Sequence, residues 1–210
     1  MASKNVDAAP EKKALNTRDL FVEARGKFSP ESVQHLNLWK EDGTYNWESN
    51  IMSRIVAGTF GPGYQPRFYE QCVVLQNRAD NNAHWQSEDP AWVGKASMSK
   101  LHFFVVPPLD LEAKWEQMFN VVSLPNTPET IQMLERMQKA AVGYVKSEHP
   151  DVNVDNLEMF FHCYPHNSLG LLHMHVIDRS QVGPSYIAQS HKNLSVSEII
   201  QGLLLTKSLL

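Results

Sequence analysis

Residues 171–177 read Leu-Leu-His-Met-His-Val-Ile, and this stretch determines how the rest of the chain is interpreted. Two histidines, His173 and His175, stand two positions apart within an apolar run. Successive side chains of a β-strand point to opposite faces, so both imidazoles are predicted to share one face and their apolar neighbours the other. A neutral imidazole is a nucleophile and a general base near pH 7, and a second imidazole sets its tautomer or supplies a proton. The alternative is a pair of ordinary hydrogen-bonded histidines, because the H-x-H pattern alone has little specificity.

The composition excludes several classes of protein. The 210 residues are 42% hydrophobic and 20% charged, which predicts one large globular domain or a domain with an extension. A net charge of −4 disfavours binding to extended nucleic acid or to an anionic membrane surface. No apolar run reaches the roughly 18 to 20 residues of a spanning helix, and no signal peptide is visible. We therefore expect a cytoplasmic protein, with the nucleus as the alternative, in which Cys72 and Cys163 are buried thiols.

Hydrophobic periodicity predicts an α+β fold with an antiparallel sheet of about five strands and a long helix. A polar N-terminus (1–15) is expected to be disordered, a helical extension follows (16–60), and the main domain covers 61–210. The elements expected in the main domain are strands 68–75 and 101–106, a helix 127–147, strands 157–164 and 171–177, and a helix 195–207.

Two other stretches add to the histidine pattern. Asn167 and Ser168 stand in a turn just before the 171–177 strand, where an amide and a hydroxyl can donate to phosphate oxygens. His102 is the second residue of an earlier strand, and Lys100 precedes it closely. Together these residues predict a small site for an anionic group that faces a histidine nucleophile.

At this point the sequence resembles the histidine triad (HIT) superfamily of nucleotide hydrolases and transferases. The superfamily signature is His-φ-His-φ-His-φ-φ on the last core strand, and residues 171–177 match it except that Leu171 replaces the first histidine. Residues 100–107 (KLHFFVVP) resemble its earlier histidine-bearing strand, and Asn167-Ser168 takes the place of its phosphate-binding pair. The resemblance covers residues 66–180, and within the superfamily the sequence is similar to both the aprataxin and the scavenger-decapping branches.

The resemblance implies a role for each matching residue. His173 would attack the α-phosphate and form a covalent nucleotidyl-histidine, while His175 would support it or bind a phosphate oxygen. His102, Lys100 and the Asn167-Ser168 pair would contact the substrate phosphates. Asn77 takes the place of a ribose-binding Asp and keeps an acceptor without the charge. The resemblance also implies a nucleotide or phosphorylated small molecule as partner, a homodimer, and no metal or other cofactor.

Three alternatives to this interpretation stay open. Leu171 removes an imidazole and is expected to place apolar surface beside the site, so the chain could be a nucleotide-binding or sensing module without turnover. The fold could also serve non-nucleotide chemistry, with the 16–60 segment and a Trp-containing loop reshaping the pocket. A zinc site built from the four histidines of the sheet is the third alternative, although no C-x-x-C or H-E-x-x-H spacing supports it. The absence of cysteines after residue 178 argues against the zinc finger of the aprataxin branch.

Overall fold

The predicted α+β class with an antiparallel sheet is confirmed. The computed structural model describes residues 17–25, 54, 66–107, 119–166 and 171–205. Within these residues, six antiparallel strands, one more than expected, form a single sheet in the order β1-β2-β3-β5-β4-β6. The strands are β1 (Arg67–Tyr69), β2 (Cys72–Gln76), β3 (His102–Val106), β4 (Leu157–His162), β5 (Met174–Asp178) and β6 (Asn193–Ser195). The helices are α1 (Thr17–Ala24), α4 (Ala79–Ala83), α6 (Pro128–Glu148), α7 (Pro184–Gln189) and α8 (Val196–Leu205), with 3₁₀ turns η2 (Val121–Ser123), η3 (Val154–Asn156), η4 (Arg179–Gln181) and η5 (Ser190–Lys192).

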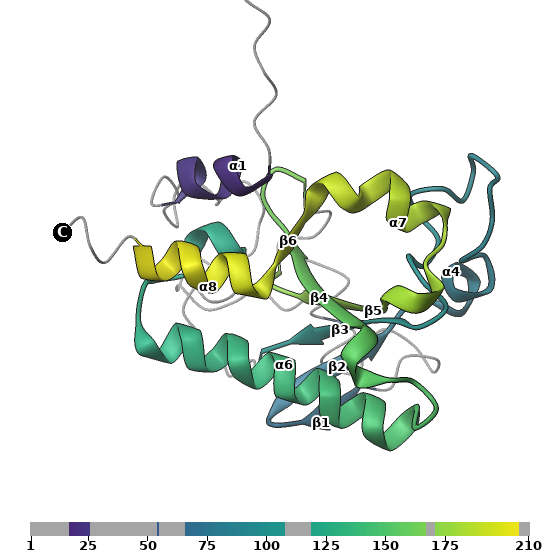
Figure 1. The fold of residues 1–210 in the computed structure, drawn as a ribbon, viewed down its shortest axis with the longest axis horizontal. Helices are drawn as coiled ribbons and strands as arrows, with labels where there is room; N and C mark the ends of the chain where they lie inside the picture. Colours follow the sequence, from purple (N-terminus) through teal and green to yellow (C-terminus); the bar gives the residue numbers. More distant parts are fainter. Residues whose placement is uncertain (1–16, 26–53, 55–65, 108–118, 167–170, 206–210) are drawn as a thin grey trace, which may run out of the picture.

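Helices α6 and α8 cover one face of this sheet (Figure 1). The long helix begins where the sequence predicts: the Thr127 hydroxyl accepts a hydrogen bond from the backbone N–H of Thr130, and Pro128 occupies the first helical position. Its apolar stripe joins the strand side chains in one core, and the stripe consists of Leu134, Met137, Ala140, Ala141, Tyr144 and Val145. The core therefore lies on the α6 side, and the opposite face of the sheet is available for other chemistry.

The first strand of the main domain is broken where the sequence predicts continuity. Glu70 and Gln71 have φ values of +48° and +63°, and this two-residue turn reverses the chain between β1 and β2. Such turns usually carry Asn-Gly or Asp-Gly, so the sequence contains no signal for this one. Contacts with α6 stabilise it instead: the Tyr69 hydroxyl lies 3.1 Å from Glu148 Oε1, and Arg136 donates to Gln71 at 3.1 Å.

Two strand ends also differ from prediction. β4 ends at His162 instead of residue 164, because the chain then turns with the His166 N–H bonded to the Cys163 carbonyl. β5 begins at Met174 instead of residue 171, so His173 lies just before the strand. The short α7 and β6 were not predicted. The last helix does begin at the expected capping box, in which Ser195 and Glu198 exchange hydrogen bonds.

The N-terminal helix α1 is part of the main core. Phe21 is 1% exposed, and its ring lies so close to Gly202 of α8 that a Cβ there would be 2.6 Å from it. Arg25 donates to the carbonyls of Gly202 and Leu124, which ties α1 to α8 and to η2. Apart from residue 54, the rest of the expected helical extension (26–60) lies outside the described residues.

Two further expectations concern the cysteines and membranes. Cys72 and Cys163 are both buried and unpaired, and burial raises their thiol pKa values to about 11 and about 12. Among the helices of the described ranges, none combines the length and the apolar character needed to cross a bilayer.

The packing of α1 predicts the effect of two substitutions on one helix. Phe21→Ala should lower the free energy of unfolding by about 3 kcal/mol, because it removes a buried aromatic ring. Val22→Ala, at a side chain 61% exposed, should change it by less than about 0.5 kcal/mol. Urea unfolding followed by circular dichroism measures both. Equal stabilities of the two variants would show that α1 does not contribute to the core.

Candidate active site

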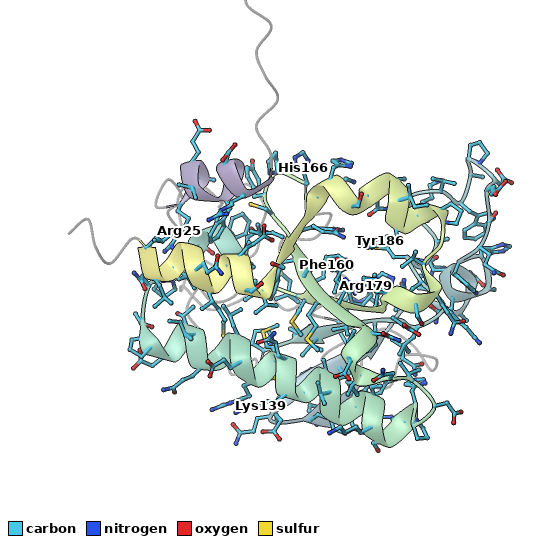
Figure 2. All side chains as sticks on the ribbon, in the orientation of Figure 1. Arg25, Lys139, Phe160, His166, Arg179 and Tyr186 are labelled. Atoms are coloured by element: carbon cyan, nitrogen blue, oxygen red, sulfur yellow. The ribbon has the colours of Figure 1, made fainter. Side chains whose placement is uncertain are left out.

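The face of the sheet opposite α6 carries the histidines. In the strand register, His175 of β5 lies between Phe104 of β3 and Phe160 of β4, and His102 lies opposite Ile177. The alternate residues Met174 and Val176 belong to the main core, as the alternation predicts. Phe160 and Ile177 pack with Met98, and Tyr186 of α7 lies against this group (Phe160 and Tyr186 are labelled in Figure 2). Residues far apart in sequence thus form one layer.

His173 is held in a single tautomer. Its Nδ1 lies 2.6 Å from the carbonyl oxygen of Leu171, and because a carbonyl only accepts, Nδ1 must carry the proton. The lone pair of the neutral ring is then on Nε2. Burial lowers the pKa of His173, although the bond to Leu171 opposes this shift, so the ring is neutral near pH 7. A neutral imidazole with a fixed lone pair is the form that acts as a nucleophile.

His102 and His175 form a directed chain of hydrogen bonds. The backbone N–H of Met98 donates to His102 Nδ1 at 3.2 Å, which leaves the proton of the neutral ring on Nε2. His102 Nε2 lies 3.2 Å from His175 Nδ1 and therefore donates to it. The proton of neutral His175 is then on Nε2, a buried atom that has no hydrogen-bond partner among the described residues. A buried donor without an acceptor costs about 1–3 kcal/mol, which is typical of a group that awaits a ligand.

His162 completes a cluster of four imidazoles. Its ring centroid is 4.2 Å from that of His175, and the rings of His173 and His175 are 5.0 Å apart. Burial, followed by repulsion from the other histidines, lowers the pKa of His102 to about 3 and that of His162 to about 4. The pKa of His175 is lowered for the same reasons. The whole cluster is therefore uncharged at neutral pH.

His162 connects the cluster to Asn193. Its Nε2 donates a hydrogen bond to Asn193 Oδ1 at 3.2 Å. The His162 ring also contacts His175 and belongs to the cluster. Asn193 was not identified from the sequence, because it lies in a three-residue edge strand whose partners on β4 are 31 to 35 positions away. Only knowledge of that pairing could have identified it.

Asn77 lies beside His102 and supports the loop around it. Its Nδ2 is 2.9 Å from Ser97 Oγ and 3.3 Å from His102 Nδ1, while its Oδ1 accepts from the Arg78 backbone N–H at 3.1 Å. Asn81 of α4 also donates to this oxygen at 3.4 Å. Asn77 thus positions His102 and α4 within the protein. Its predicted contact with a ribose stays a prediction.

The other predicted phosphate ligands are placed as follows. Asn167 and Ser168 lie outside the described residues. The Lys100 side chain is exposed, and its backbone N–H bonds to the Gln181 carbonyl. No contact in the described part of the chain brings this lysine to the histidine cluster, so its role also stays a prediction.

Leu171 does not line the site as expected. Its side chain is 1% exposed and packs into the main apolar core, because the chain has not yet entered β5 at this position. What it gives the site is its backbone carbonyl, the acceptor for His173 Nδ1. Since a carbonyl is present whatever the side chain, loss of the first signature histidine leaves this contact intact.

The aromatic residues of the 77–99 loop serve packing. Trp92 stacks on His84, with ring centroids 3.9 Å apart and planes 16° apart. Trp85 lies against Gly183, where an added Cβ would be 1.9 Å from the Trp85 carbonyl oxygen.

Across the part of the chain that the structure describes, no three His, Cys, Asp or Glu side chains are arranged to hold a metal ion.

Burial of neutral imidazoles predicts a pH-dependent stability. The unfolded chain binds protons at histidines below a pH of about 6.5, whereas folded His102 and His162 resist protonation down to about 3 and about 4. Stability should therefore fall as the pH decreases from 6.5 toward 4. His102→Asn should reduce this slope by about 1.4 kcal/mol per pH unit, the contribution of one proton. Urea unfolding at several pH values measures it, and an unchanged slope in the variant would contradict the buried neutral state.

Comparison with known proteins agrees with the fold and with the histidine pattern. The family described as "Scavenger mRNA decapping enzyme C-term binding" matches residues 70–191, more than half of the chain. This range includes β2 to β5, the helix α6 and all four histidines of the cluster, whereas β1 lies just before it. No curated protein matches the sequence. Of the two branches that the sequence resembles, the match selects scavenger decapping, and the chain belongs to this family of HIT-like domains.

Proposed function

We propose that the protein is a nucleotide hydrolase or nucleotidyl transferase that cleaves a phosphoanhydride, phosphoester or phosphoramidate through a covalent nucleotidyl-His173. One observation carries the proposal: the Nε2 lone pair of His173 and the N–H of His175 Nε2, which has no partner within the described residues, belong to adjacent rings on one face. A nucleophile beside a donor with no acceptor is what attack on a phosphoryl group requires. Membership in the decapping family supports a nucleotide as the substrate.

The first step forms a phosphorus–nitrogen bond. His173 Nε2 attacks the phosphorus, the bond to the leaving group breaks, and the leaving group departs with that electron pair. The His173 ring gains positive charge, which the Leu171 carbonyl stabilises through the Nδ1–H bond. His175 Nε2–H donates to a nonbridging phosphoryl oxygen, an acceptor it lacks in the free protein.

The second step regenerates the histidine. Water or another hydroxyl acceptor attacks the same phosphorus, the phosphorus–nitrogen bond breaks, the electron pair returns to His173 Nε2, and the proton of the acceptor passes to solvent. His102 keeps His175 in the required tautomer, because its own Nδ1 is fixed by the Met98 N–H. Asn167, Ser168 and Lys100 are proposed to contact further phosphate oxygens. A homodimer and a cytoplasmic location remain predictions from the sequence.

His173→Ala should lower turnover by at least about 10³-fold, because no other group replaces a covalent nucleophile. Nucleotide binding should change little. The experiment incubates the protein with nucleotides carrying a labelled α-phosphate, measures product, and isolates the acid-labile adduct on a histidine. His84→Ala is the control, because it removes an exposed histidine outside the cluster.

The same experiment separates the alternatives. Binding without product or adduct in the wild-type protein would favour a sensing module, and equal turnover in the His173→Ala variant would overturn the proposed mechanism. A thermal shift with other phosphorylated metabolites, but with no nucleotide, would favour non-nucleotide chemistry, because a ligand of the native state raises apparent stability.

A further inference from the structure

Two buried side-chain donors lack an acceptor within the described residues, and the proposed mechanism uses only His175 Nε2. The other is Nδ2 of Asn193. This residue begins the edge strand β6, directly after Lys192. It lies beyond residues 70–191, so the family match assigns it no role.

The amide of Asn193 has a defined orientation. His162 lies opposite it in the register of β4 and β6, and His162 Nε2 is 3.2 Å from Asn193 Oδ1. The amide oxygen only accepts, so it accepts a hydrogen bond from the N–H of His162. The NH₂ group of the amide then faces a different partner. The His162 ring in turn packs on His175 at 4.2 Å. The three side chains thus form a row from β5 through β4 to β6.

The electrostatic surroundings of this row favour an anion. Burial, then the neighbouring His173, lowers the pKa of His162, and the charge of Lys192 adds to the effect. No carboxylate of the described residues is among the groups that shift the pKa values of the four clustered histidines. Two unpartnered donors with a cation nearby match a ligand with anionic oxygens.

We propose that Asn193 is a second substrate-binding residue, whose Nδ2 donates to an anionic oxygen on the β6 side of the phosphoryl group bound by His175. His162 is the positioning residue that orients the amide. Because β4 separates β5 from β6, the backbones that carry the two donors are about 10 Å apart, and the donors serve different oxygen atoms. The inference rests on the proposed function, since it takes the His175 donor as the phosphoryl site.

Substitution by aspartate separates binding from a purely structural role. Asn193→Asp keeps an oxygen that accepts from His162 but replaces the NH₂ donor by negative charge. If Asn193 only holds His162, the variant should bind ligand like the wild type. If it donates to an anion, binding should become weaker than with Asn193→Ala, which removes the donor without adding charge.

The ligand in the test is inorganic pyrophosphate, which presents anionic oxygens on two linked phosphorus atoms. Its binding to the full chain is measured by isothermal titration calorimetry at pH 8, where His162 stays neutral. We expect the dissociation constant to rise at least tenfold in Asn193→Asp and about threefold in Asn193→Ala. Asn153→Asp is the matched control, because it adds the same charge at the exposed cap of η3 and keeps the acceptor for the Asp155 N–H.

Several results would overturn the inference: no binding of pyrophosphate by the wild type, binding by Asn193→Asp within twofold of the wild type, or an equal loss in Asn153→Asp. If circular dichroism shows that Asn193→Asp does not fold, Asn193→Ala provides the test. An affinity of Asn193→Ala for pyrophosphate equal to that of the wild type would then overturn the inference. Failure of the proposed function would give a different result. Pyrophosphate binding would still depend on Asn193, but no covalent adduct would form on His173.

Discussion

The antiparallel register of β3, β5 and β4 is the constraint on which the site depends. It places His175 between Phe104 and Phe160, and it brings His102 within hydrogen-bond distance although the two histidines are 73 positions apart in sequence. A shift of one residue would turn every histidine of these strands into the core on α6 and expose the apolar partners. The packing of Met174 and Val176 against that core therefore fixes the chemistry of the opposite face.

The sequence predicted those parts of the fold that follow from local patterns. The H-x-H alternation, the Thr127-Pro128 helix start and the Ser195 capping box each depend on residues close in sequence, and all three are present. The turn at Glu70 and Gln71 could not be predicted, because contacts with α6 hold it and its residues give no signal. Asn193 joins the site only through tertiary pairing of a three-residue strand, which has no periodicity to detect.

The loss of the first signature histidine has a smaller structural effect than its side chain suggests. Position 171 orients His173 through its carbonyl oxygen, which any residue supplies. The leucine side chain packs into the core, where an imidazole would need a hydrogen-bond partner. The substitution thus exchanges a polar group for apolar packing and leaves the tautomer of the nucleophile unchanged. This is why the departure from the signature does not by itself argue against catalysis.

Burial of four imidazoles together keeps the nucleophile neutral and reactive, but it lowers the free energy of unfolding. Each ring is desolvated, and three of the four are also repelled by the charge of other histidines, so the neutral, nucleophilic form dominates at physiological pH without a carboxylate partner among the described residues. The protein compensates by satisfying most ring nitrogens with fixed donors and acceptors: the Met98 N–H, the Leu171 carbonyl and the Asn193 amide oxygen. The remaining donors without an acceptor therefore indicate a place for a ligand. Among the described residues, this layer pairs most of its polar atoms but leaves His175 Nε2 and Asn193 Nδ2 unpaired, and these are the two donors for which we propose a ligand with acceptor oxygens.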